Sequence, residues 1–114
     1  MNKVILLGRL GSDPEFKATS GGEMCKFSVA TSEKFQSDGE IKERTDWHKI
    51  VVWGKLAQTC SKYLTKGSQV AIEGRLHTRS WEDDRGKKKF VTEVIAEDVK
   101  FLDLKKTSDG GLPL

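Results

Sequence analysis

The sequence predicts an all-β domain that contains one helix. Apolar and polar residues alternate with a period of two through most of the chain, which is the pattern of strands with one buried face. The period changes to 3.6 residues only in the segment between Gly54 and Gly67, where a helix is expected. A length of 114 residues is sufficient for one domain with a single modest core.

The first predicted strand runs from Asn2 to Leu10, and the turn residues 11–14 end it. A short extended piece at residues 16–18 is expected to continue this strand past a bend, so that the first strand is long and broken. The second strand starts at about Met24 and runs toward Phe35. One of its two sides is expected to be buried, and the sides are Cys25, Phe27, Val29 and Thr31 against Met24, Lys26, Ser28 and Ala30.

Residues 36–44 are polar, highly charged and nearly free of large apolar side chains, which predicts a long, mobile hairpin loop. The third strand covers residues 45–55 and is ended by Gly54. Its alternation divides the side chains between two faces. One face carries Trp47, Lys49, Val51 and Trp53, and the other carries His48, Ile50 and Val52. The second face has the β-branched residues expected of a barrel interior, so the tryptophans are free to face outward.

One helical stripe follows, and Gly67 is expected to end the helix as a C-terminal glycine does. The stripe consists of Leu56, Ala57, Cys60, Tyr63 and Leu64. In the fourth strand the predicted inward residues are Val70, Ile72, Gly74, Leu76 and Thr78. The predicted outward residues are Gln69, Glu73, Arg75, His77, Arg79 and Trp81. This outward face is therefore a basic stripe that ends in tryptophan.

A second charged hairpin loop is predicted at residues 82–89, and a fifth strand from about Phe90 to Ala96, extended or padded by residues 99–102. The order is three strands, one helix and two strands. A five-stranded, partly open Greek-key barrel of the OB type has this order. We expect this domain to span residues 1–105 and a short flexible tail to span residues 106–114.

Composition and motifs exclude several classes of protein. The amino-terminal apolar run is too short for a signal peptide or a membrane span. Cys25 and Cys60 match no metal-ligand spacing and are expected to be buried free thiols in a reducing compartment. The two histidines have no partners at metal or triad spacing, and no phosphate-binding loop is present. We therefore expect no enzyme, metal or cofactor.

Four aromatic residues lie among polar and charged residues on the predicted strands, namely Phe35, Trp47, Trp53 and Trp81. The alternative is that each is a core residue, as a lone tryptophan in a small domain often is. Grouped with cations, they instead suit single-stranded nucleic acid, whose base faces stack on rings and whose phosphates need positive charge. The sequence therefore predicts exposed stacking platforms.

The net charge of +3 does not by itself indicate a polyanionic partner, so the placement of the cations must decide. The candidates for phosphate contacts are Lys3, Arg9, Lys49, Lys55, Lys62, Arg75, Arg79, Lys87 and Lys88. For any one of them the alternative is a merely solvated surface charge. His77 lies in the outward stripe, while His48 faces the interior or an interface.

Several motifs in the same order resemble the bacterial and organellar single-stranded DNA-binding proteins. They are residues 1–11 with Asp13-Pro14-Glu15, then Ala30-Thr31-Ser32, Trp47-His48, Gly54-Lys55-Leu56-Ala57, Tyr63-Leu64, residues 66–70, Ile72-Glu73-Gly74, and Thr78-Arg79 with Trp81. The resemblance implies a cytoplasmic, nucleoid-associated OB-fold homotetramer. It would bind single-stranded DNA without sequence preference in replication, recombination and repair. It also implies that Phe35, Trp47, Trp53 and Trp81 stack on bases, and that His48 lies at the subunit interface.

The chain departs from the pattern of this family at a few positions. The family often has tryptophan at position 35, phenylalanine at 53, and basic residues at 77 and 80. The end, Leu112-Pro113-Leu114, echoes a family tail that recruits genome-maintenance proteins, but only Asp109 supplies acidity there. Two alternatives remain open, namely a primosome accessory module whose main surface binds protein, and an RNA-binding role like that of cold-shock domains.

Overall fold

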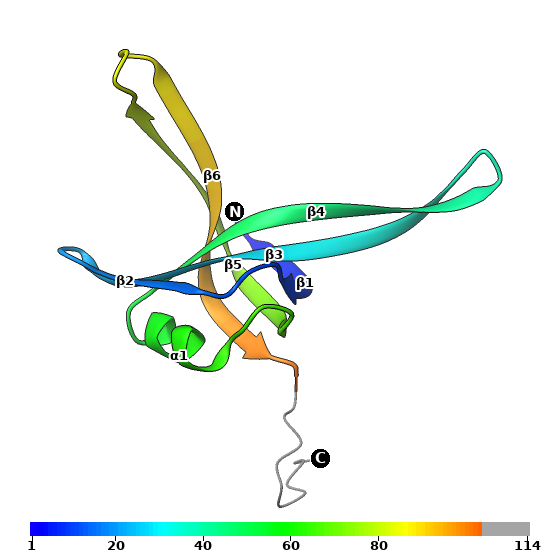
Figure 1. The fold of residues 1–114 in the computed structure, drawn as a ribbon, viewed down its shortest axis with the longest axis horizontal. Coiled ribbons are helices and arrows are strands. Elements are labelled where there is room, and N and C mark those ends of the chain that lie inside the picture. Colours follow the sequence, from blue (N-terminus) through cyan, green and yellow to red (C-terminus); the bar gives the residue numbers. More distant parts are fainter. Residues whose placement is uncertain (104–114) are drawn as a thin grey trace, which may run out of the picture.

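Five strands of the chain close into a barrel, and one helix packs at its side (Figure 1). The structure is a computed structural model that describes residues 1–103. The elements are β1 (Val4–Leu10), β2 (Glu15–Thr19), β3 (Gly22–Ser37), β4 (Glu40–Trp53), α1 (Lys55–Tyr63), β5 (Gln69–Glu82) and β6 (Lys88–Phe101). The predicted tail at residues 106–114 lies outside the described residues.

The barrel closes through the order β1-β5-β6-β4-β3, with β3 returning to β1 at Arg9 and Leu10. All of these pairings are antiparallel except that of β4 with β6, which is parallel and short. β2 pairs with β3 beyond the bend, so β1 and β2 together form the long, broken first strand that the sequence predicts. The OB-type barrel is confirmed.

The core consists of the alternating apolar residues predicted for the barrel strands. Its most deeply buried side chains are Ile50, Ile72, Val29, Val52, Val70, Cys25 and Cys60. Both cysteines are buried free thiols, as expected. Burial raises the pKa of Cys60 to about 12, with a smaller contribution from the neighbouring Cys25, because a low-dielectric interior disfavours the thiolate. Burial raises the pKa of Cys25 as well, which favours the protonated thiol, the less nucleophilic form.

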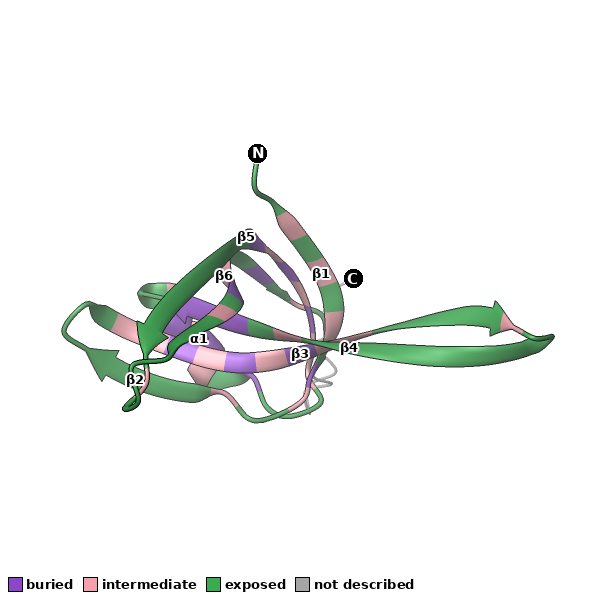
Figure 2. Cartoon of the chain, turned by 90° about the horizontal axis from the view of Figure 1, so that it is seen from above, coloured by how far each residue is buried: buried purple, intermediate pink, exposed green. Residues whose placement is uncertain are grey.

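The long loop predicted at residues 36–44 is wrong, because β3 and β4 continue as a two-stranded ribbon out to a two-residue turn. Asp38 and Gly39 form this turn with φ angles of 53° and 76°, as a type I′ hairpin requires. The ribbon projects from the barrel and both of its faces are largely exposed (Figure 2). A polar, highly charged strand is therefore stable there, and its composition resembles that of a loop.

β5 and β6 form a second ribbon, so the fourth and fifth strands are also longer than predicted. β6 begins at Lys88, so the predicted loop at residues 82–89 shrinks to the turn between the two strands. A β-bulge at Glu73 and Gly74 interrupts the pairing of β5 with β6 at the point where β5 ends its pairing with β1. Beyond it Leu76 is 49% exposed and Thr78 is exposed, so the prediction that these two residues face inward is wrong.

α1 begins directly after Gly54, as predicted, but it ends earlier than the sequence indicates. Leu64 follows the helix with an extended backbone, and Gly67 lies in the next turn with φ 91°. The prediction that Gly67 ends the helix is therefore wrong. Tyr63, predicted in the buried stripe, is 59% exposed, whereas Ala57 and Cys60 are buried. Within residues 1–103, no helix is long and apolar enough to span a membrane.

Candidate nucleic-acid interface

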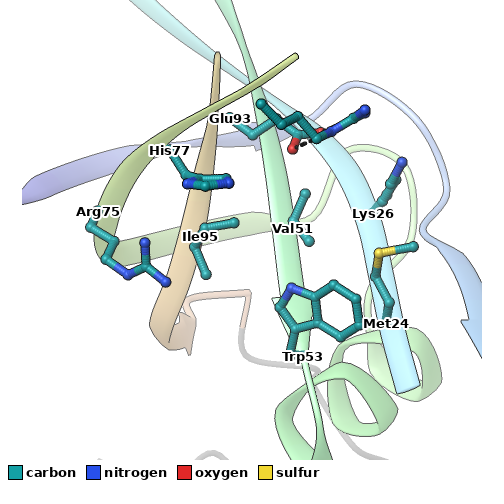
Figure 3. Close-up of a pocket in the computed structure, with 9 residues that line it drawn as sticks. Met24, Lys26, Val51, Trp53, Arg75, His77, Glu93 and Ile95 are labelled. Carbon is teal, nitrogen blue, oxygen red and sulfur yellow. Dashed lines mark hydrogen bonds and ion pairs between the residues drawn. The ribbon is translucent and has the colours of Figure 1, made fainter. Parts of the chain in front are cut away.

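A groove of about 410 Å³ lies across the outer side of the barrel where the two ribbons diverge. Its floor is apolar and is formed by Met24, Val51, Trp53 and Ile95. Arg75 and Lys26 lie on opposite sides of this floor, with Val51 and Trp53 between them (Figure 3). His77, Arg79 and Glu93 complete the lining. An apolar floor between cations suits a partner that carries flat apolar groups on an anionic chain.

The four predicted stacking residues are all exposed, but they are spread over three strands. Trp47 and Trp53 lie on β4 at the barrel, with exposed fractions of 63% and 42%. Phe35 lies on β3 in the first ribbon and is 37% exposed, while Trp81 lies on β5 in the second and is 44% exposed. The described residues show no contact of these rings with one another. Each ring therefore presents a separate platform, and only Trp53 lines the groove itself.

Trp47 has a close neighbour that the sequence did not indicate. Its six-membered ring lies over Gly11, where a Cβ atom would overlap the ring. The glycine that follows β1 therefore makes room for the indole. The only sequence signal is the glycine directly after the first predicted strand, which by itself indicates no more than a turn.

Two further groups near the predicted rings were missed. Phe90 on β6 is 64% exposed and has the Lys88 Nζ atom 5.7 Å from its ring centroid. Arg44 on β4 has its guanidinium carbon 5.2 Å from the centroid of the Phe35 ring. The sequence predicts Phe90 at the start of the fifth strand and Arg44 at the end of a loop, without a role for either. The ribbons, which the sequence did not predict, are what bring these residues to the surface beside the candidates.

The predicted cations fall into two groups. Lys3 pairs with Glu73, and the hydrogen bond and charge of this carboxylate raise the pKa of Lys3. Arg9 donates to the carbonyl oxygen of Gly67 at 2.9 Å, and Arg79 pairs with Glu93 at 3.1 Å. The remaining candidates form no ion pair within residues 1–103, namely Lys49, Lys55, Lys62, Arg75, Lys87 and Lys88. These six have their charge available for an anionic partner.

The two histidines occupy different surroundings. His77 lines the groove beside Arg75 and Arg79. His48 is half-buried, and its Nε2 atom lies 2.8 Å from the Thr31 hydroxyl on the neighbouring strand. In the part of the chain that the structure describes, no group of three or more histidine, cysteine or acidic side chains is placed to hold a metal ion.

A closed five-stranded barrel with exposed aromatic rings and free cations on its outer strands is the architecture of an oligonucleotide-binding protein of the OB-fold class. The sequence model of the single-strand binding protein family matches residues 1–102, and the chain belongs to this family.

Two similar proteins agree with this assignment. Single-stranded DNA-binding protein 1 of Chlorobaculum tepidum is 52% identical over an alignment of 113 residues, which covers 96% of this chain and 70% of the relative. A solved structure described as the Plasmodium falciparum SSB complex with ssDNA superposes with a TM-score of 0.81 at 40% identity. This match covers 90% of this chain and 96% of the other. The predicted family resemblance is confirmed.

Proposed function

We propose that this chain binds single-stranded DNA without sequence preference and protects it during replication, recombination and repair. The observation that carries the proposal is the set of four exposed rings on β3, β4 and β5, on a surface that also carries six candidate cations without a carboxylate partner in the described residues. The similar solved structure, a complex with single-stranded DNA, supports it. The chain acts by binding, without catalysis or a cofactor, in the cytoplasm at the nucleoid.

Stacking supplies the affinity that does not depend on sequence. Bases stack on Phe35, Trp47, Trp53 and Trp81, and each stacked base contributes roughly 1–3 kcal/mol. Every base has a flat apolar face, so the rings accept all four. The spacing of the platforms over two ribbons and the barrel favours a strand that is drawn across the outer surface rather than inserted into a closed pocket.

Phosphates are bound by the cations that the protein does not itself neutralise. Lys49, Lys55, Lys62, Arg75, Lys87 and Lys88 form this set. Lys3 and Arg9 must first leave their partners, so we expect smaller contributions from them. Each phosphate that is neutralised releases counterions, and log affinity therefore falls with log salt with a slope of about 0.7 per contact.

Self-association into a homotetramer completes the proposed function. Ile5 and Leu7 on the outer face of β1 are 72% and 60% exposed in the single chain, and Leu76 is 49% exposed. Exposed apolar side chains of this kind favour burial against a second copy. We assign His48 to contact between subunits, so a change there weakens assembly first and DNA binding as a consequence. A tetramer offers four sets of rings to one strand, which raises the affinity further.

The test is a titration of the protein with oligo-dT. We expect strong quenching of the tryptophan emission and a shift in mobility. Replacement of Trp47 or Trp81 by alanine should weaken binding by at least roughly 5- to 150-fold, because one stacked base is lost in each subunit that contacts the DNA. Phe16→Ala is the control, since Phe16 is an exposed ring on β2 outside the proposed site.

Three results would contradict the proposal. Unchanged emission and mobility would show that oligo-dT does not bind. Full affinity of both tryptophan variants would favour a surface that binds protein, as in an accessory module. Preference for oligo-U over oligo-dT would favour an RNA-binding role.

A further inference from the structure

Two of the four exposed rings carry an arginine that is itself paired with a glutamate. The guanidinium carbon of Arg79 lies 5.1 Å from the centroid of the Trp81 ring, and the Arg79 Nε atom lies 3.1 Å from the Glu93 carboxylate. In the other ribbon Arg44 lies over Phe35 and forms an ion pair with Glu33. The same three chemical groups, carboxylate, guanidinium and ring, thus occur once on each projecting ribbon.

The two sets are built from different strand positions. Arg79 and Trp81 are two residues apart on β5 and so face the same side, and Glu93 reaches Arg79 from β6. In the first ribbon the glutamate and the ring, Glu33 and Phe35, are two residues apart on β3. Arg44 lies directly opposite Glu33 on β4. The two sets therefore do not come from a repeated sequence motif. They share the same contacts, ring to guanidinium to carboxylate, and both lie on a ribbon with little core beneath it.

We propose that Arg79 and Arg44 are positioning residues, which support the rings of Trp81 and Phe35 and do not bind phosphate. The guanidinium covers one face of each ring and leaves the other face for a base. The glutamate holds the guanidinium in place and balances its charge. This deepens the proposed binding of single-stranded DNA and rests on it, because it divides the arginines of the surface into those that contact phosphate and those that support stacking.

Charge and burial support this division. Glu93 is the one carboxylate that lines the groove, and its side chain is only 7% exposed. An anion buried in a site for a polyanion opposes binding unless it has a structural partner there, and Arg79 is that partner. A guanidinium already neutralised by a carboxylate gains little from a phosphate and releases few counterions. Arg75, on the same strand and lining the same groove, has no such carboxylate within residues 1–103.

The two sets differ in exposure, which predicts effects of different size. The Glu33 side chain is 63% exposed, so water and salt screen its pair with Arg44. The Glu93 pair is screened much less. We therefore expect removal of the Glu93 charge to alter the behaviour of Trp81 more than removal of the Glu33 charge alters that of Phe35.

The experiment measures oligo-dT affinity against salt concentration for the double variants Arg79→Gln with Glu93→Gln and Arg44→Gln with Glu33→Gln, and for the control Arg75→Gln. The Arg75 variant should lower the slope by about 0.7 for each subunit in contact with DNA, because a phosphate contact is lost. The two double variants remove both charges of a pair, so they should leave the slope unchanged and weaken binding about two- to fivefold at every salt concentration, because a cation–π support is lost. If either double variant lowers the slope as Arg75→Gln does, its arginine binds phosphate and the proposal is overturned.

A second measurement follows the ring without DNA. In a Trp47→Phe, Trp53→Phe background, Trp81 is the one tryptophan of the chain. Removal of Arg79, or of the Glu93 charge by Glu93→Gln, should change the emission of Trp81 and its quenching by iodide. Unchanged emission in both would also overturn the proposal. This measurement does not depend on DNA. If oligo-dT does not bind, the proposed function is wrong, but the fluorescence still tests whether Arg79 and Glu93 support the Trp81 ring.

Glu93→Gln carries a prediction of its own. It releases Arg79 while keeping the size of the side chain, so the salt slope should become steeper by about 0.7 per contacting subunit. A slope that stays at the wild-type value would count against the role of Glu93. If this buried substitution prevents folding, the exposed pair gives the same test, since Glu33→Gln should release Arg44 and steepen the slope in the same direction.

Discussion

The position of the Trp47 ring depends on the absence of a side chain at Gly11. The indole lies over Gly11, which follows β1, and the ring remains 63% exposed although one side of it is covered. An aromatic platform on a strand has rotameric freedom, and a supporting surface reduces the entropy lost when a base stacks on it. Trp81 and Phe35 have arginines in this supporting role, whereas Trp47 has backbone.

We predict that Gly11→Val weakens oligo-dT binding about as much as Trp47→Ala does, by roughly fivefold or more. The added side chain occupies the space of the Trp47 ring, which must turn away. Thermal stability should change little, because the displaced ring moves into solvent. Fluorescence titration and a melting curve check this.

Gly21→Val is the matched control, because the nearest atom to a Cβ at this turn glycine is 3.7 Å away. Wild-type affinity for Gly11→Val would show that the position of Trp47 does not depend on Gly11.

Single residues were the most predictable part of the site. The charged and polar residues near them in the sequence indicated that four aromatic residues face outward. All four are exposed, namely Phe35, Trp47, Trp53 and Trp81. Their contacts with DNA stay a proposal. The role of Arg79 could not be predicted, because Glu93, its partner, lies on another strand. Which residues of β5 and β6 meet depends on their register, and alternation in one strand carries no information on this.

The two ribbons are the elements that carry the binding groups away from the barrel. β3 and β4 are joined by 14 residue pairs in all, and the outer pairs, which have no core beneath them, form the first ribbon. Such a ribbon depends on its turn and on cross-strand pairs, since isolated hairpins are only marginally stable. Its end is a two-residue turn with positive φ at Asp38 and Gly39. The position of Phe35 is therefore linked to the conformation of this turn.

We predict that Gly39→Val loosens the first ribbon without affecting the barrel. A β-branched residue at φ 76° is strained, so the turn should open and Phe35 should lose its fixed position. Affinity for oligo-dT should fall several-fold, while the melting temperature stays within about 2 °C of wild type, because the ribbon contributes little to the core. Hydrogen exchange of the ribbon amides is the direct measurement.

Asp38→Asn is the control for this element, because asparagine adopts positive φ readily. Unchanged exchange in the Gly39 variant would show that the cross-strand pairs alone hold the ribbon.

The complete barrel leaves one apolar strand face without a partner. Ile5 and Leu7 point outward from β1, on the side opposite the Val4 and Leu6 side chains that pack against the core. The core of the single chain does not need them, so their apolar character has another cause. The proposed association of copies through this face would explain it.

We predict that the double change Ile5→Lys, Leu7→Lys reduces the molar mass in solution from about four chains to fewer. Each chain has a mass of 12.8 kDa. The charges remain in water in the free chain but are costly at an interface. Light scattering after size-exclusion chromatography measures the mass, and circular dichroism confirms that the barrel is intact.

Ile41→Lys is the matched control. Ile41 is 76% exposed near the tip of the first ribbon, so it is an equally exposed apolar residue outside the β1 face. A variant of Ile5 and Leu7 with the mass of the wild type would assign the assembly to another surface.

The sequence by itself determined the barrel, the single helix and the four outward rings, because side-chain alternation and helical period are properties of the local backbone. The tertiary structure alone decided where the strands leave the barrel, which arginines are neutralised and what lies under Trp47. These features depend on which strands lie beside one another and on what covers each face. A strand exposed on both faces needs no alternation, so its sequence resembles a loop, and only the pairing of β3 with β4 and of β5 with β6 identifies it as a ribbon.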